Sequence, residues 1–162
     1  MRRGGFGAFL ASLLLALLLQ LVALPDLLEP LRPLWLPLIL GFWAMFMPDM
    51  PVLAVAWIAG LLCDVAYDAP LGQYALGLVT VAFLLRRLRG TLLVFPLWQA
   101  TLALAPAWAM YAFLMFWIDG LTHHSADAAR RWLPVLTTTL LWPFVAGLLN
   151  GLLQPRNRSV LP

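Results

Sequence analysis

Two aspartates spaced four residues apart, Asp64 and Asp68, are the side chains with the clearest potential for chemistry. Residues at this spacing share one face of a helix. A carboxylate at the centre of a bilayer costs about 2.5–3.5 kcal/mol on insertion scales, so a buried pair of acids would indicate a proton relay or a cation site. The alternative is structural, with Asp68 among the lipid headgroups and Asp64 hydrogen-bonded to backbone amides and to Gln73. The scarcity of other polar residues favours this structural alternative.

The segment that follows the two aspartates predicts a turn and the start of another helix. Pro70 breaks the preceding helix, Gly72 permits close approach of two backbones, and Gln73 can hydrogen-bond within or between helices. If Asp64 fixes this corner by hydrogen bonding alone, Asp64→Asn should keep the protein active. Asp64→Leu should disrupt it, because unpaired donors cost about 1–3 kcal/mol.

Gly147 and Gly151 form a G-x-x-x-G pattern within an apolar stretch. This pattern is typical of faces where two membrane helices approach closely. The partner is either a helix of another protein or a neighbouring helix of the same bundle, and the sequence leaves both alternatives open.

The sequence carries no pattern that indicates catalysis, a cofactor or a metal. Its three serines have no plausible base beside them within the apolar stretches, and no phosphate-binding glycine loop is present. His123 and His124 are adjacent, whereas metal ligands on a helix are spaced three or four residues apart, so we expect a solvated loop there. The single cysteine, Cys63, permits no intrachain disulfide. We therefore expect a protein that is not an enzyme and uses no cofactor.

The composition indicates an integral membrane protein. Of the 162 residues, 64% are hydrophobic and 10% are charged, and the mean hydropathy is +0.92. Soluble domains are about half apolar and about a quarter charged. Because a transmembrane helix takes about 20 residues, six such helices would use most of this chain.

Prolines and charges divide the chain into six apolar stretches, which predict one all-α, polytopic transmembrane domain spanning residues 1–162. The third stretch has only 12 residues between Val52 and Cys63, about 18 Å of helix, so we expect its helix to continue through Asp64. A basic loop, 86–89, should separate the fourth and fifth spans. The six predicted spans are roughly 6–24, 34–47, 52–68, 71–85, 96–118 and 132–153.

The charges predict the orientation of these spans. With six spans and the N-terminus inside, the inner segments carry seven arginines and one acid, whereas the outer segments carry three arginines and six acids. This asymmetry follows the positive-inside rule and places both termini in the cytoplasm. The arginines alternate with apolar stretches instead of forming one basic face, so no nucleic-acid partner is expected.

The region from Trp35 to Gln99 resembles the MreD family, the rod shape-determining membrane proteins of bacteria. The motifs follow one another in the order and spacing of that family, and the predicted size and six-span layout also agree. They are Trp43-Ala44 to Pro48, Gly60-Leu61-Leu62-Cys63-Asp64, Leu71-Gly72-Gln73-Tyr74-Ala75-Leu76, the basic loop, and Leu97-Trp98-Gln99.

The resemblance implies a non-catalytic component of the cell-wall elongation complex in the bacterial inner membrane. Proteins similar to MreD support cell shape and lateral peptidoglycan synthesis together with the single-span protein MreC, the filament protein MreB, RodA and its partner transpeptidase. Asp64, Pro70, Gly72, Gln73, Gly147 and Gly151 are then structural or partner-interface candidates.

MreD-like proteins are also similar to the substrate-binding subunits of energy-coupling-factor transporters, which supplies an alternative function: a membrane subunit of a vitamin-type transporter. A binding subunit should enclose a pocket of convergent polar groups. In this sequence the acids gather at one end of the third span and the spans consist mostly of leucine, alanine and valine, which favours the cell-shape role.

Overall fold

The computed structural model describes residues 3–25, 27–47, 49–122 and 128–153. Within these ranges the chain forms six α-helices and one short 3-10 helix, and no strand. The predicted all-helical fold is therefore confirmed. The elements are α1 (Arg3–Leu21), η1 (Glu29–Leu31), α2 (Trp35–Phe46), α3 (Val52–Ala66), α4 (Gln73–Leu92), α5 (Leu97–Leu121) and α6 (Ala128–Leu153).

Two of the described helices are long and apolar enough to cross a membrane, Leu97–Leu121 and Arg131–Leu152. The apolar helices Gly5–Leu21 and Val52–Ala66 are shorter. α2 has 12 residues, about 18 Å of helix against a hydrocarbon core of about 30 Å. The crossing of the bilayer by all six helices therefore stays a prediction.

The fourth helix is longer than the sequence predicted. α4 continues past Leu85 through three arginines to Leu92, so the expected basic loop at 86–89 is wrong. Arginine is a good helix former. Leu85 and Leu92 are both buried and lie seven residues apart, so the same face of α4 stays against the core.

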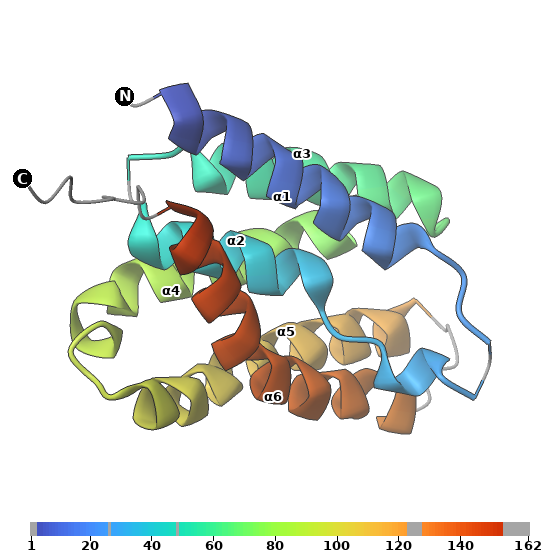
Figure 1. Cartoon of the computed structure of the whole chain (residues 1–162). Helices are drawn as coiled ribbons and strands as arrows, with labels where there is room; N and C mark the ends of the chain where they lie inside the picture. The colour runs from blue at the N-terminus through green and yellow to red at the C-terminus, as the bar shows by residue number, and fades with distance from the viewer. Residues whose placement is uncertain (1–2, 26, 48, 123–127, 154–162) are drawn as a thin grey trace, which may run out of the picture.

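α4 lies in the middle of the bundle and contacts α2, α3 and α5, while α1 packs on α2 and α6 packs on α5. α2 is buried over ten of its 12 residues, as expected for a helix that is apolar on every side. α1 begins and α6 ends at the same end of the molecule (Figure 1). The opposite end carries η1, and we call it the η1 end.

The crossing of α3 and α4 is set by Gly60. A Cβ atom on Gly60 would lie 2.2 Å from the Cα of Ala75, so only glycine permits this backbone contact. The close crossing fixes the end of α3 against the start of α4, which is where Asp64 and Gln73 lie.

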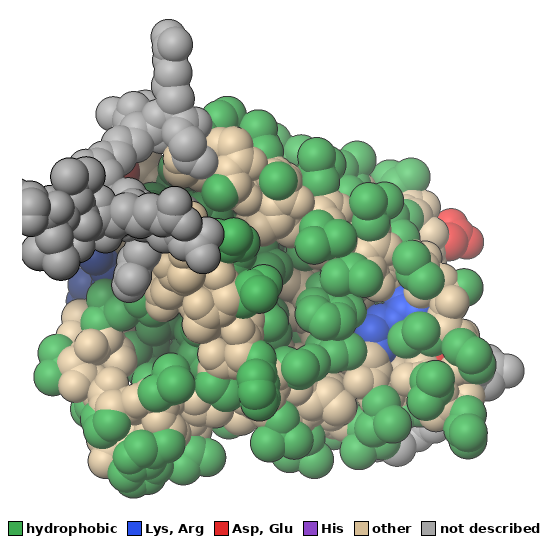
Figure 2. Space-filling model, viewed as in Figure 1, with side chains coloured by type: hydrophobic (Ala, Val, Ile, Leu, Met, Phe, Trp, Pro, Cys, Tyr) green, Lys and Arg blue, Asp and Glu red, His purple; other side chains and the backbone are tan. Residues whose placement is uncertain are grey.

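The surface is largely hydrophobic. Figure 2 shows hydrophobic side chains over most of the visible face, with few acidic and basic side chains among them. Leu140 and Phe144 on α6 are 71% and 74% exposed. Such a surface suits contact with lipid better than contact with water.

α6 bends midway, so that its second half leaves α5 and crosses α2 (Figure 1). Pro143 lies inside this helix. A proline removes one backbone hydrogen bond and its ring clashes with the carbonyl four residues earlier, which bends a helix. The two halves of α6 therefore have different neighbours.

Candidate functional site

Asp64 caps the start of α4. Its Oδ2 accepts a hydrogen bond of 2.8 Å from the backbone amide of Gly72, and its Oδ1 accepts one of 2.6 Å from the amide of Tyr74. The residue is 1% exposed. α3 includes Asp64, as the sequence predicted. The first turn of a helix has unpaired amides, and a carboxylate is a favourable acceptor for them.

Asp68 does not share a helix face with Asp64. α3 ends at Ala66, and Asp68 lies beyond it with a φ of 51° and an exposed side chain. The geometry therefore does not form the pair of acids that a relay or a cation site at these two residues would need.

The turn before α4 depends on Gly72 and Pro70. Gly72 has a φ of 98°, a left-handed conformation that residues with a Cβ rarely adopt. The amide of Gln73 donates to the carbonyl of Pro70 over 3.0 Å. The left-handed conformation of Gly72 and the turn closed on Pro70 bring the amides of Gly72 and Tyr74 within hydrogen-bonding distance of the Asp64 carboxylate.

The expectation that Asp64→Asn leaves the protein intact is not supported by this geometry. Both carboxylate oxygens accept from backbone N–H donors, so an asparagine would place its own NH₂ group against one of those donors. The hydrogen bonds that Asp64 makes at the start of α4 use both of its carboxylate oxygens.

Gln73 has a different partner from the one expected. Its Nε2 donates to Oδ1 of Asp119 over 2.7 Å, and not to Asp64. Asp119 lies in α5, is 6% exposed, and pairs through Oδ2 with Nε of Arg131 at 2.7 Å. Nη2 of Arg131 contacts the same oxygen. Three helices, α4, α5 and α6, therefore meet at one buried carboxylate.

Tyr74 and Tyr67 extend this arrangement toward α3. The side chain of Tyr74 is hydrogen-bonded to Arg131, and its ring stacks on that of Tyr67 with centroids 5.2 Å apart. The η1 end therefore contains one cluster of polar side chains, formed by Gln73, Tyr74, Asp119 and Arg131.

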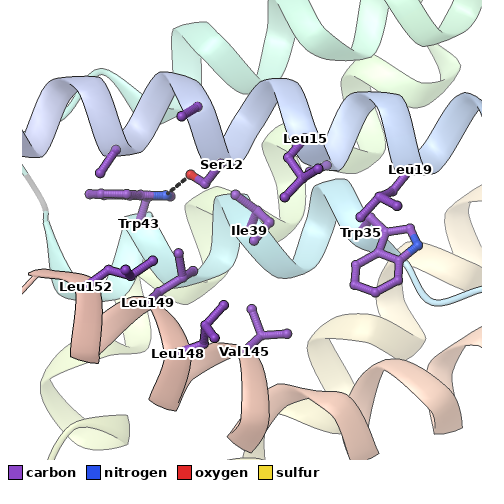
Figure 3. Close-up of a pocket in the computed structure, with 13 residues that line it drawn as sticks. Ser12, Leu15, Leu19, Trp35, Ile39, Trp43, Val145, Leu148, Leu149 and Leu152 are labelled. Carbon is purple, nitrogen blue, oxygen red and sulfur yellow. Dashed lines mark hydrogen bonds between the residues drawn. The ribbon is translucent and has the colours of Figure 1, made fainter.

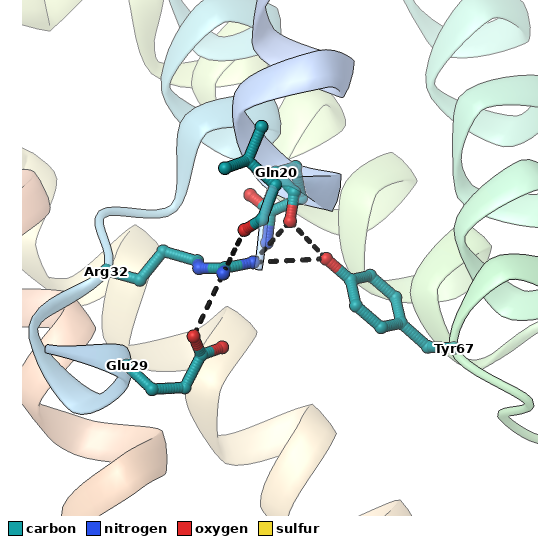
Figure 4. A network of polar contacts seen from close by, with 5 residues as sticks. Gln20, Glu29, Arg32 and Tyr67 are labelled. Atoms are coloured by element: carbon teal, nitrogen blue, oxygen red, sulfur yellow. Dashed lines mark hydrogen bonds and ion pairs between the residues drawn. The ribbon is translucent and has the colours of Figure 1, made fainter. Parts of the chain in front are cut away.

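A second set of polar contacts surrounds Arg32, which lies between η1 and α2 (Figure 4). Its guanidinium donates to the carbonyls of Gln20 and Val22 at the end of α1 and to Oε2 of Glu29. The hydroxyl of Tyr67 also donates to the carbonyl of Gln20. Arg32 is 7% exposed. It joins the end of α1 to the following segment and to α3.

The start of α2 is held by a side chain from α6. Oγ1 of Thr138 accepts a hydrogen bond of 2.8 Å from the backbone amide of Leu34 and donates to the carbonyl of Pro134 over 2.6 Å. Thr138 is fully buried. No pattern in the sequence identified Arg32, Asp119, Arg131 and Thr138 as residues that position helices.

Gly147 and Gly151 lie on an exposed face of the second half of α6. A Cβ atom added to either glycine would meet no described atom within 4 Å. Of the two alternatives for the G-x-x-x-G pattern, this placement favours an external contact over a contact within the bundle.

Among the described residues, no group of three or more His, Cys, Asp or Glu side chains is placed to hold a metal ion. His123 and His124 lie outside the described residues. The described polar side chains at the η1 end bind one another and the backbone, and these contacts join neighbouring helices.

Comparison with known proteins assigns the family. A family model described as rod shape-determining protein MreD matches residues 1–152. A protein of Haemophilus influenzae named "Rod shape-determining protein MreD" is 26% identical over 136 residues, which cover 84% of each chain. No solved structure matches. Because the family match covers nearly the whole chain, the chain belongs to the MreD family of rod shape-determining membrane proteins.

Proposed function

We propose that this protein is a non-catalytic, multi-pass component of the bacterial inner membrane that supports rod shape and lateral peptidoglycan synthesis within the cell-wall elongation complex. Its direct partner is a single-span protein resembling MreC, and MreB, RodA and the elongation transpeptidase are further members of the assembly. The observation that carries this proposal is the family match over residues 1–152.

The geometry supports a binding role over catalysis. The carboxylates of Asp64 and Asp119 are occupied by partners within the chain. The exposed face at Gly147 and Gly151 instead offers a surface without obstruction by described atoms. Association of helices in lipid depends on close van der Waals packing, which small residues permit. This face suits the single transmembrane helix of the partner.

Depletion of the resident MreD-family protein in a rod-shaped bacterium tests the proposal. Expression of this chain should restore rod shape and should recover the MreC-like protein in mild detergent. Gly147→Leu and Gly151→Leu should lower this recovery, because a leucine separates the two helices. Gly7→Leu is the matched control, since Gly7 is also an exposed helical glycine with open space at its Cβ position.

Failure to restore shape at a normal membrane level would contradict the cell-shape role. Undiminished recovery with both glycine variants would show that the partner binds elsewhere. A vitamin requirement in the depleted strain, relieved by this chain, would instead support a transporter subunit.

The proposed topology has both termini in the cytoplasm. The start of α1 and the end of α6 lie at one end of the molecule (Figure 1), which supports an even number of crossings. Reporter fusions should give cytoplasmic signals at both termini, and a reporter between Asp119 and Arg131 should give a periplasmic signal. A periplasmic signal from the C-terminal fusion would contradict this topology.

A further inference from the structure

Three arginines lie together near the end of α4, and none of them forms an ion pair with another described residue. Arg86 and Arg87 are exposed and Arg89 is partly exposed. The positions from 86 to 89 make about one turn of helix, so the three Cα atoms lie within about 5 Å along the helix axis. The chain contains no acidic residue between Asp68 and Asp119. This turn of α4 therefore carries a concentrated positive charge.

The acidic groups of the bundle do not balance this charge. Asp119 contacts Gln73 at the start of α4, and residues 73 and 86 are 13 positions apart, about 20 Å along the helix. This distance exceeds the screening length of about 8 Å at physiological ionic strength. Asp49, in the turn between α2 and α3, is exposed and forms no ion pair with a described residue. The dipole of α4 places only about half a negative charge at its end. An anion from outside the chain is therefore the expected partner.

The segment that follows the arginines is apolar and exposed. It turns from α4 into α5 at the end of the molecule opposite to η1 (Figure 1). Val94 is 82% exposed, Leu97 59% and Trp98 64%. Exposed tryptophan is typical of the level of the lipid headgroups, and segments that combine arginines with exposed apolar side chains bind at the boundary between headgroups and acyl chains. We call residues 86–98 the arginine corner.

The apolar groove between α1 and α6 has no such charge. Figure 3 shows its walls, with Leu15 on α1, Ile39 on α2 and Leu148 on α6. None of the residues that line this groove is charged, so nothing in it selects one class of ligand. At the arginine corner, by contrast, the charge itself defines the ligand as an anion.

We propose that the arginine corner binds the phosphate of an anionic phospholipid such as phosphatidylglycerol. The planar guanidinium group presents paired N–H donors that match two phosphate oxygens. The acyl chains of the same lipid cover the exposed apolar segment, whereas an acidic protein segment would satisfy the arginines alone. Phosphatidylethanolamine carries an ammonium group beside its phosphate, which the arginines repel, so the site prefers the anionic lipid. The inference rests on the membrane setting of the family and not on its role in cell shape.

Native mass spectrometry of the full chain in mild detergent tests this proposal, with phosphatidylglycerol and phosphatidylethanolamine added in equal amounts. We expect the wild type to retain more phosphatidylglycerol. Arg87→Gln should lower this retention about fivefold, which corresponds to about 1 kcal/mol for one arginine at an anionic surface. Arg86→Gln combined with Arg87→Gln should lower it further. Both positions are exposed, so the melting temperature should hardly change. Thr91→Gln, at an exposed uncharged position of α4, is the matched control.

Equal retention of the two lipids by the wild type would overturn the proposal. Unchanged retention of phosphatidylglycerol in the double variant, or an equal loss in Thr91→Gln, would also overturn it. A photo-reactive residue at Leu88, which is 40% exposed, should cross-link to lipid in living cells. Cross-linking to a protein or to a second copy of this chain, and not to lipid, would contradict the proposed ligand. Lipid retention is measured without the partner protein, so this result is independent of the proposed cell-shape role.

Discussion

The two halves of α6 differ in their contacts with the rest of the bundle. The first half is fixed by polar contacts, with Arg131 bound to Asp119 and Thr138 bound to the amide of Leu34. The second half, beyond Pro143, carries two exposed glycines and leucines such as Leu148, which is 67% exposed.

This difference suggests separate tasks for the two halves: the first half contributes to stability and the second half to binding. Polar groups that are buried must be paired, and removal of a partner costs the desolvation of the group left behind. Exposed small residues contribute little to stability but permit another helix to approach. We therefore expect changes at the η1 end to affect folding, and changes in the second half of α6 to affect association.

The largest effect on stability is expected from Arg131→Ala. It leaves the carboxylate of Asp119 buried without its charge partner, which costs about 3 kcal/mol, the low end of the range for broken buried pairs, because Arg131 is partly exposed. The melting temperature in detergent and the membrane level should both fall. Arg86→Ala, at an exposed position of α4, is the control. Equal loss in both variants would show that the ion pair is not specifically required.

Asp64 variants should have the next largest effect. Asp64→Asn places an NH₂ group against one backbone donor and should destabilise by about 1 kcal/mol, the low end of the cost of an unpaired buried group. Asp64→Leu leaves two donors unpaired and should destabilise by about 2 kcal/mol. Thermal unfolding in detergent measures both, and Asp68→Asn is the control because Asp68 is exposed. A normally stable but inactive Asp64→Asn protein would contradict the structural role and point to proton or cation chemistry.

Thr138→Val should cost about 1 kcal/mol, because it removes the acceptor of the Leu34 amide while nearly conserving volume. Thr138→Ser should restore much of the loss. The neighbouring Thr139→Val is the matched control, since its hydroxyl bonds to the carbonyl of Val135 within its own helix. The comparison of melting temperatures checks this prediction, and indistinguishable values for the two valine variants would refute it.

The smallest effect on stability is expected from Gly147→Leu and Gly151→Leu. Their Cβ positions are open, and surface substitutions away from special features change stability by about 0.5 kcal/mol or less. The melting temperature of the isolated protein should therefore hardly change. A fall comparable with that of Arg131→Ala would show that this face packs internally.

The sequence predicted contacts that are local and missed those that are distant. Asp64 was placed inside its helix because the apolar stretch before it is short, and its backbone donors follow within ten residues. The partner of Gln73 lies 46 residues away on another helix. A hydropathy profile places Asp119 and Arg131 at the ends of two spans and does not indicate a contact between them. Their opposite charges, on either side of one connection, were an available signal for that contact.

The helix boundaries show the same limit. Three arginines after Leu85 indicated a loop. Because arginine is a good helix former and Leu92 is buried, α4 instead continues to Leu92. Arg32 is one of the three arginines counted in the outer segments, but it is buried, because three carbonyl and carboxylate acceptors surround its guanidinium. Tertiary contacts determine both the end of α4 and the burial of Arg32, and composition gives no information about such contacts.

Photo-cross-linking in living cells tests the division between the two halves of α6 most directly. A photo-reactive residue at Gly147 should form an adduct with the MreC-like single-span protein. The same residue at Leu62, an exposed position on α3, should form none, and both variants should reach normal membrane levels. An adduct from Leu62 but not from Gly147 would contradict the assignment of partner binding to the second half of α6.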